Sequence, residues 1–251
     1  MPRYKLTIEY DGSPFSGWQR QDNAPSIQQT LEEAAERLTG TFARVQGAGR
    51  TDAGVHATGQ VAHFDTVQPW DPFKLQGALN HFVRPAPIAI VGAEQVSDEF
   101  HARFDAIERS YTYRIINRRP LLTFDRGKAW KVQNTLDVSA MQEGAQFLLG
   151  HHDFTTFRSV NCQAKSPVKS VDEIRVERTG ERIDIHVRAR SFLHNQVRSF
   201  VGTLELVGAG KWEPHEVGAA LAACDRARCG PVAPPDGLYL VNVRYRAADG
   251  S

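Results

Sequence analysis

Apolar and polar residues alternate in several short stretches of the chain, the first of them close to Met1. Residues 4–10, YKLTIEY, combine this alternation with β-favouring residue types, which predicts a strand with one buried face. Similar apolar or alternating runs predict further strands at 59–65, 88–96, 110–117, 171–177, 183–189 and 238–245.

Between these stretches, apolar residues recur at helical spacing. Ser26 is the expected N-cap of the first helix, and Gly40 ends its pattern. Asp71 or Pro72 begins the second helix, and Ser139 is expected to cap the third. Two more helices are predicted, at 192–207 and at 214–223, the latter opening with a proline.

The order of these elements predicts an α+β protein. The segment 110–117 resembles the first strand in its alternation, and a helix follows each of them, so we expect two ferredoxin-like β-α-β halves, 1–104 and 105–251. Hairpin connections favour an antiparallel sheet. Because no Pro-, Gly- and Ser-rich tract separates the halves, we expect them to share that sheet and to leave a central cleft.

The charge of the chain is informative only when the two halves are counted separately. The chain has 251 residues, with 30 Lys and Arg against 29 Asp and Glu, so its total charge indicates no nucleic-acid binder. Residues 1–104 have a net charge of −3 and residues 105–251 a net charge of +4. A polyanion would meet the second half first, if its cations share a face.

Cysteines and apolar runs indicate where the protein resides. Cys162, Cys224 and Cys229 are an odd number without CxxC spacing, so we interpret them as reduced thiols and expect no metal. No apolar run approaches the roughly 18 residues of a membrane span, and the first strand pattern leaves no room for a signal peptide. We therefore expect a cytoplasmic protein that binds no membrane.

The stretch 47–57, GAGRTDAGVHA, has the composition of a functional site. Its glycines permit close approach of a ligand, and Arg50 and Asp52 could face one substrate from an irregular loop. A Gly-rich turn with a solvated aspartate would have the same local sequence. Neither this stretch nor 208–211, GAGK, completes a phosphate-binding fingerprint.

Seven blocks of the sequence resemble the TruA-type tRNA pseudouridine synthase family, and they follow the family's order. They are YDGSPFSGWQRQ (10–21), GRTDAGVHA (49–57), FHARFDA (100–106), RSYTYRI (109–115), HHDFTTFR (151–158), FLHNQVRSFVG (192–202) and GLYLVNVRY (237–245). The resemblance implies an isomerase with the pseudouridine synthase fold that converts uridine to pseudouridine in the anticodon stem-loop of tRNAs, near positions 38 to 40. It also implies a homodimer that needs no cofactor or metal.

The resemblance further assigns roles to four residues. Asp52 corresponds to the catalytic aspartate, and Arg198 to the arginine beside it. Tyr111 matches the tyrosine that stacks on the flipped base, and Arg50 resembles the residue that fills the gap left by that base. His56 and Asp105 are interpreted as structural, His56 fixing the loop backbone.

Phosphate contacts and competing functions are less sharply indicated. Candidate RNA contacts are Arg20, Arg103, Arg158 and Lys165.

A non-catalytic RNA-binding module would share the strands and the basic second half, but it would not need a carboxylate in the loop. A hydrolase would pair Asp52 with a second acid, and no block that carries the site supplies a clear one.

Overall fold

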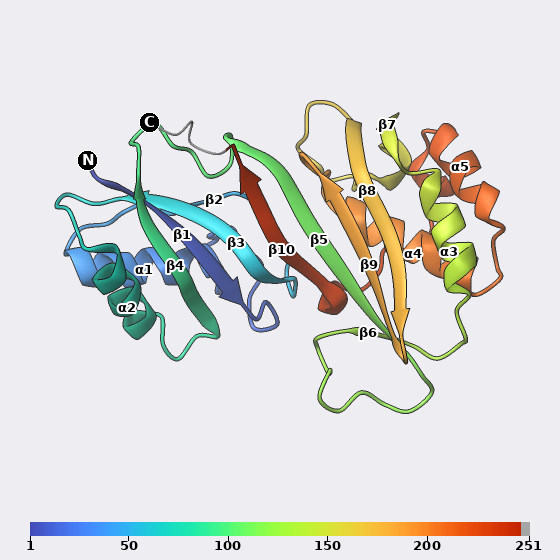
Figure 1. Cartoon of the computed structure of the whole chain (residues 1–251), viewed down its shortest axis with the longest axis horizontal. Helices are drawn as coiled ribbons and strands as arrows, with labels where there is room; N and C mark the ends of the chain where they lie inside the picture. The colour runs from blue at the N-terminus through green and yellow to red at the C-terminus, as the bar shows by residue number, and fades with distance from the viewer. Residues whose placement is uncertain (247–251) are drawn as a thin grey trace. The chain divides into compact units, whose positions relative to one another are not determined.

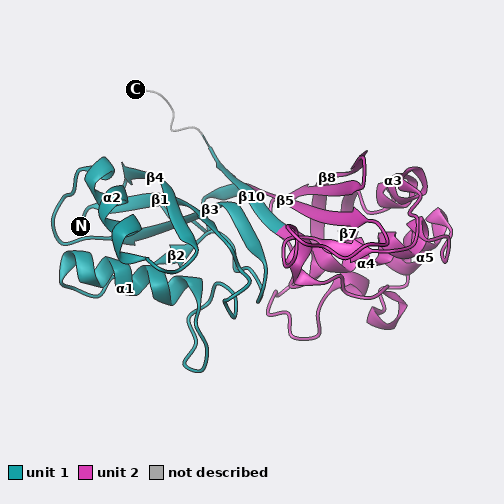
Figure 2. Ribbon diagram, turned by 90° about the horizontal axis from the view of Figure 1, so that it is seen from below, with its two compact units in different colours: residues 1–107, 239–251 teal, residues 108–238 magenta. Residues whose placement is uncertain are grey.

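The computed structural model describes residues 1–246, which form two compact units (Figure 1, Figure 2). Unit 1 is Met1–Ile107 together with the described residues from Tyr239 onward, and unit 2 is Glu108–Leu238. The last strand of the chain therefore belongs with the N-terminal residues, whereas the sequence pattern grouped it with the second half. Its hydrogen-bonding partner in unit 1 explains this, because strand pairing joins segments that are distant in sequence.

Unit 1 is built on a mixed sheet. β1 (Arg3–Tyr10) lies between β4 (Ile88–Val96) and β3 (His56–Asp65), and it is antiparallel to both. β2 (Gln46–Gly47) is antiparallel to β3, but β10 (Leu238–Tyr245) runs parallel to it. The α+β class is confirmed, while the expectation of an antiparallel sheet is wrong at this pair, because the chain returns to unit 1 after passing through unit 2.

Two helices accompany this sheet. In α1 (Ile27–Thr39) the Ser26 side chain accepts a hydrogen bond from the third residue of the helix, and Gly40 ends it in the left-handed region at φ 73°. Asp71 caps α2 (Pro72–Phe82) in the same way, with proline in the first turn. These ends lie where the sequence predicts them. α1 contacts α2, and α2 packs against β4.

Unit 2 contains a second group of strands. Its main order is β5–β9–β8–β7, with antiparallel pairs throughout, and a short strand, β6, runs parallel to β5. The bounds of these strands are β5 (Ala106–Asn117), β6 (Trp130–Val132), β7 (Gly150–Asp153), β8 (Val168–Thr179) and β9 (Arg182–Ala189). The sequence pattern did not predict β6 or β7, because runs of three or four residues are too short to show alternation.

The helices of unit 2 pack against one another, and α3 also packs against β8. Phe154, Phe157 and Phe200 are fully buried and form an aromatic cluster in this unit. The helices are α3 (Val138–Gln146), α4 (Gln196–Gly208) and α5 (Pro214–Ala222), with single 3-10 turns at Thr155–Phe157, Arg226–Arg228 and Pro235–Gly237.

Two predicted helix starts in unit 2 are wrong. α3 is capped by Asp137 and not by Ser139, because the Asp137 carboxylate accepts hydrogen bonds from the backbone N–H groups of Ser139 and Ala140. α4 begins four residues later than the apolar pattern that starts at Phe192. Asn195 adopts a left-handed backbone at φ 63°, which no helical residue can share, and the helix starts immediately after it.

Candidate active site

The loop that carries Asp52, residues 48–55, is called here the aspartate loop. The Asp52 side chain is half-buried, and its backbone carbonyl accepts a hydrogen bond from the Val55 N–H at 3.1 Å, which closes a tight turn. The segment that follows β1 holds the loop from one side, because the Trp18 N–H donates to the Thr51 carbonyl at 3.0 Å. The carboxylate therefore sits on a backbone with a defined conformation.

Two buried polar side chains fasten the aspartate loop to the sheet. Gln60 is fully buried, and its amide binds both backbone groups of Gly49: Nε2 donates to the carbonyl at 2.9 Å, and Oε1 accepts from the N–H at 3.2 Å. The Tyr10 hydroxyl lies 2.8 Å from the Thr51 hydroxyl, and it also accepts from Gln60 at 3.4 Å. Side chains of the sheet thus hold the residues on both sides of Arg50.

Glycine is required where the segment after β1 approaches this loop. A Cβ on Gly12 would lie 2.0 Å from the Val55 carbonyl oxygen, so the two backbones could not stay in contact. At Gly17 the backbone has φ +105°, and a Cβ would lie 2.7 Å from the Thr51 carbonyl oxygen. The block 10–21 therefore supports the aspartate loop, a role that the sequence alone did not reveal.

His56 follows the aspartate loop at the start of β3. Its Nδ1 accepts a hydrogen bond from the Gly12 N–H at 3.1 Å, and its ring stacks on Tyr239 with centroids 4.8 Å apart. The ring is almost fully buried. His56 thus ties the backbone of the Gly12 segment to the end of the loop, as its structural interpretation expected.

Arg50 lies beside other cations of unit 1. Its pKa is lowered from the ordinary arginine value by partial burial and then by the charges of Arg103 and Arg44. All three residues are exposed. Because the charges of these arginines repel one another, an anion at this position would be bound favourably.

A buried carboxylate pairs with one of these cations, Arg44, and with a further one, Arg20. Glu32 on α1 has a fully buried side chain, which pairs with Arg20 at 3.0 Å and with Arg44 at 3.4 Å. One helical turn earlier, Gln28 accepts from the Arg20 N–H and donates to the Val45 carbonyl. The buried face of α1 thus fixes both the Arg20 segment and the segment that leads into the aspartate loop.

In unit 2, Tyr111 lies on β5 and packs edge-to-face against Phe192, with ring centroids 5.3 Å apart. Tyr111 is half-buried, whereas Tyr113, two residues further along the strand, is fully buried. Burial raises the pKa of Tyr113 well above the ordinary tyrosine value, and its hydroxyl donates to the Pro234 carbonyl at 2.7 Å. Tyr113 is therefore part of the core, whereas Tyr111 is only partly buried.

Arg198 lies in the first turn of α4 and is half-buried. Its Nε donates to the Ala233 carbonyl at 2.7 Å, and its Nη1 donates to the Asn195 side chain at 3.0 Å. Asn195 is the residue with the left-handed backbone, so the turn that starts α4 also orients the guanidinium. These bonds hold the arginine in one direction within unit 2.

The remaining RNA-contact candidates differ in their surroundings. The Arg158 guanidinium donates to the carbonyls of Cys162 and Ala164, so it braces the loop that carries Lys165. Lys165 itself is exposed. Within unit 1 the structure brings Arg50 near Arg103 and fixes Asp52 on the same loop as Arg50, whereas Tyr111 and Arg198 belong to unit 2. The pairing of Asp52 with Arg198 stays a prediction.

The sequence model described as "tRNA pseudouridine synthase" matches residues 6–105 and 145–246, which is most of the chain. The chain belongs to the tRNA pseudouridine synthase family. A relative named tRNA pseudouridine synthase A from Parvibaculum lavamentivorans is 64% identical over 98% of this chain and 100% of its own length. Another of that name, from Paracoccus denitrificans, is 60% identical over 98% of this chain and 97% of its own length.

Among solved structures, a chain described under "Crystal Structure of a Cbf5-Nop10-Gar1 Complex" is similar at a TM-score of 0.34 and 11% identity. That match covers 94% of this chain and 57% of the other. Within residues 1–246 no helix is long and apolar enough to cross a membrane. The same described residues bring together no three His, Cys, Asp or Glu side chains that could hold a metal ion.

Proposed function

We propose that this family member isomerises uridine to pseudouridine in the anticodon stem-loop of tRNAs, near positions 38 to 40, with Asp52 as the nucleophile on a flipped-out base. The aspartate loop carries the proposal. It presents a half-buried carboxylate on a backbone that is held by Gln60, by Tyr10 and by the glycines of the segment after β1. Such preorganisation is what a reacting group needs, since small displacements of it cost much rate.

The reaction breaks the N1–C1′ bond of the nucleotide, turns the uracil and forms a C5–C1′ bond. The ring cannot turn within a stacked helix, so the nucleotide is first flipped out, at a cost of about a few kcal/mol. An ionised Asp52 would either attack C6 of the ring or support departure of the uracil from C1′. When the C5–C1′ bond forms, C5 loses its hydrogen to solvent as a proton and N1 takes up a proton, so that the product is an isomer of the substrate.

Three further residues complete the proposed site. Arg198 would pair with Asp52 and favour its ionised form, as the family resemblance implies. Tyr111, which is only partly buried and packs edge-to-face against Phe192, would stack on the flipped base. Arg50, exposed beside other cations, would occupy the gap that the base leaves in the RNA.

The proposal extends to partners. The substrate would be tRNA, with Arg20, Arg103, Arg158 and Lys165 as candidate RNA contacts, and the enzyme would act as a cytoplasmic homodimer. Arg158 would act partly through the loop that it braces, since two carbonyls of that loop already accept from its guanidinium.

Replacement of Asp52 by Asn tests the reaction. With tRNA tritiated at C5 of uridine, we expect Asp52→Asn to abolish tritium release, while tRNA affinity stays within a few-fold because the aspartate charge opposes phosphate. Asp22→Asn, the same charge change at an exposed residue of unit 1, serves as the control and should keep full activity. Substantial turnover by Asp52→Asn would remove Asp52 as the nucleophile.

The same assay separates the two competing functions. A hydrolase would release free uracil and leave an abasic site, and a non-catalytic RNA-binding module would bind tRNA without releasing either tritium or uracil. Pseudouridine in the recovered tRNA, with no free uracil, is the expected result.

A further inference from the structure

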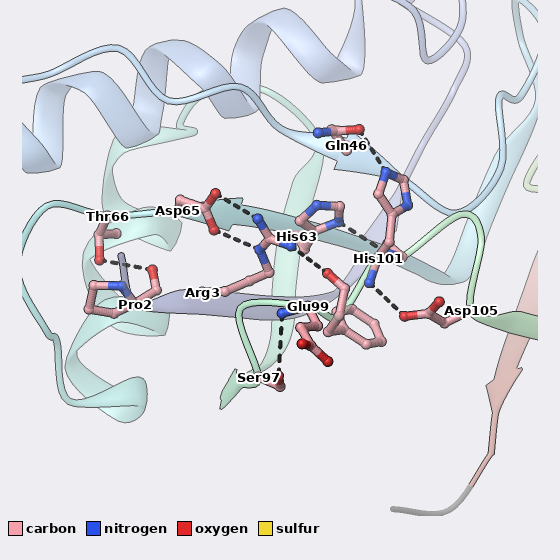
Figure 3. A network of polar contacts seen from close by, with 12 residues as sticks. Pro2, Arg3, Gln46, His63, Asp65, Thr66, Ser97, Glu99, His101 and Asp105 are labelled. Carbon is pink, nitrogen blue, oxygen red and sulfur yellow. Dashed lines mark hydrogen bonds and ion pairs between the residues drawn. The ribbon is translucent and has the colours of Figure 1, made fainter.

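The segment 100–105, FHARFD, is anchored to unit 1 through its backbone (Figure 3). Arg3, which also forms two hydrogen bonds to Asp65, donates to the Phe100 carbonyl at 2.8 Å. The Ala102 N–H donates to Nδ1 of the buried His63 at 3.1 Å, and the Ala102 carbonyl accepts from the Tyr245 hydroxyl at 2.7 Å. Strands β1, β3 and β10 thus all hold this short segment.

His101 fixes the turn at the centre of the segment. Its Nδ1 accepts from the N–H groups of Arg103 and Phe104 at 3.1 and 3.3 Å, so the neutral ring carries its proton on Nε2. That nitrogen lies 3.0 Å from Oε1 of Gln46 and donates to it. Asp105 closes the turn by accepting from the His101 N–H at 2.7 Å (Figure 3).

This anchoring presents two side chains to solvent. Phe104 is 69% exposed although its backbone is held firmly, and its ring contacts His101 with centroids 4.3 Å apart. The Arg103 guanidinium lies 5.8 Å from the centroid of the same ring. An exposed phenylalanine on a rigid support contributes little to folding, because most of its apolar surface stays in water.

The charges around Phe104 indicate which kind of partner would bind its exposed ring. Besides Arg103, the charge of which helps to lower the pKa of Arg50, the exposed Arg50 is a second cation of this unit, although unit 1 as a whole carries an excess of acidic residues. A protein partner would need an acidic surface here. An unpaired RNA strand supplies both complements at once, a base for the ring and phosphates for the cations.

We propose that Phe104 is a stacking platform for an unstacked base of the tRNA anticodon arm near the target uridine, and that Arg103 binds the adjacent phosphate backbone. This inference rests on the proposed function, because it assumes tRNA as the substrate. Flipping a nucleotide out of a stack removes neighbouring bases from their partners as well. A preformed ring beside Arg103 replaces that lost stacking, and its fixed backbone keeps the entropic cost of binding small.

The experiment measures RNA binding without turnover, in the Asp52→Asn background. Anticodon stem-loops carry the fluorescent base 2-aminopurine at one position at a time around the target uridine. We expect binding to change the fluorescence at one of these positions, and Phe104→Leu to remove that change and to raise the Kd about tenfold. Phe104→Trp should retain both the fluorescence change and the affinity.

Phe73→Leu is the matched control, since Phe73 is an 83% exposed phenylalanine of the same unit, in the first turn of α2. It should bind as the parent does. Equal effects of the Phe73 and Phe104 changes, an unchanged Kd for Phe104→Leu, or weaker binding by the Trp variant than by the Leu variant would each overturn the proposal. A changed oligomeric state of RNA-free Phe104→Leu would instead assign the ring to a protein contact.

This design separates the inference from the proposed function. If Asp52→Asn still turned over substrate, the assignment of the nucleophile would fail, whereas the binding data on Phe104 would stand or fall by themselves. Arg103→Gln gives an independent check, because loss of one phosphate contact should reduce the slope of log Kd against log salt by roughly 0.7.

Discussion

The buried side-chain amide of Gln60 holds the aspartate loop in position. The Gln60 side chain is fully buried and binds both backbone groups of Gly49, which lies three residues before the proposed nucleophile Asp52. A leucine of similar size would leave the partly buried Gly49 N–H and carbonyl without these partners. The aspartate loop would then be displaced, while the hydrophobic core would stay packed.

We therefore expect Gln60→Leu to lower kcat by at least tenfold with little change in KM, and to reduce the free energy of unfolding by about 2–3 kcal/mol. Gln76→Leu is the control, because Gln76 also donates to a backbone carbonyl of unit 1, that of Ile90, away from the aspartate loop. It should destabilise the protein to a smaller extent and leave kcat unchanged. Equal losses of kcat in both variants would mean that Gln60 acts only through stability.

His63 makes stability depend on pH. Burial, followed by the charges of His101 and Arg3, lowers the pKa of His63 from 6.5 to about 4 in the folded state. Between these pH values the unfolded chain binds a proton that the folded chain does not, so stability falls as the pH drops from about 6.5 to about 4. Protonation would also remove the acceptor that His63 offers to the Ala102 N–H.

Chemical unfolding across this pH range should show the contribution of His63. We expect His63→Asn, which keeps an acceptor but does not titrate, to lose about 2–3 kcal/mol less than the wild type between pH 7 and pH 4. At pH 8 the variant should be no more stable than the wild type. Parallel curves for the two proteins would exclude His63 as the source of the acid sensitivity.

At the scale of elements, α1 acts as a support for loops as well as a core helix. Glu32 lies on its buried face, where the carboxylate accepts from Arg20 and from the Val45 N–H and forms an ion pair with Arg44. Both arginines are partly exposed, so water compensates in part when their partner changes. The ion pairs therefore contribute more to the position of the segments that carry these arginines than to the stability of the protein.

Glu32→Gln keeps the shape and one acceptor but removes the charge. We expect it to reduce the free energy of unfolding by about 1–2 kcal/mol, measured by urea denaturation. Glu36→Gln, an exposed position on the same helix, makes the same charge change and should alter stability by less than about 0.5 kcal/mol. A neutral or stabilising Glu32→Gln would show that the two guanidiniums gain nothing from the carboxylate.

At the scale of the whole molecule, charge is unevenly divided between the units. Unit 2 has 19 Lys and Arg against 15 Asp and Glu, so its net charge is +4 in a chain whose total is +1. Binding of tRNA should therefore depend on several phosphate contacts that the cations of this unit share. Each contact releases counterions, which makes the affinity sensitive to salt.

We expect the tRNA affinity to fall steeply with salt, with a log-log slope of roughly −0.7 per contact. Lys165→Gln in unit 2 should make this slope shallower by about one contact, while Lys74→Gln, an exposed residue of unit 1, should leave it unchanged. A binding constant that stays flat between low and moderate salt would contradict the electrostatic account.

The sequence by itself determined the elements whose cause is local. The buried alternation of β1, the caps of α1 and α2, and the bounds of β10 follow from residue types within a few positions of each other. The family was also readable, because its motifs are continuous stretches of sequence. Asp52 and Arg50 could be named for the same reason.

Only the tertiary structure decided which distant residues support that motif. The register of β1 against β3 places Ile8 opposite Gln60 and Tyr10 opposite Ala57, which brings the Gln60 amide and the Tyr10 hydroxyl beneath the aspartate loop. The parallel return of β10 beside β3, and the left-handed Asn195 that delays α4, are equally invisible to periodicity. Local propensities act over a few residues, whereas pairing register and buried polar contacts join segments that meet only when the chain is folded.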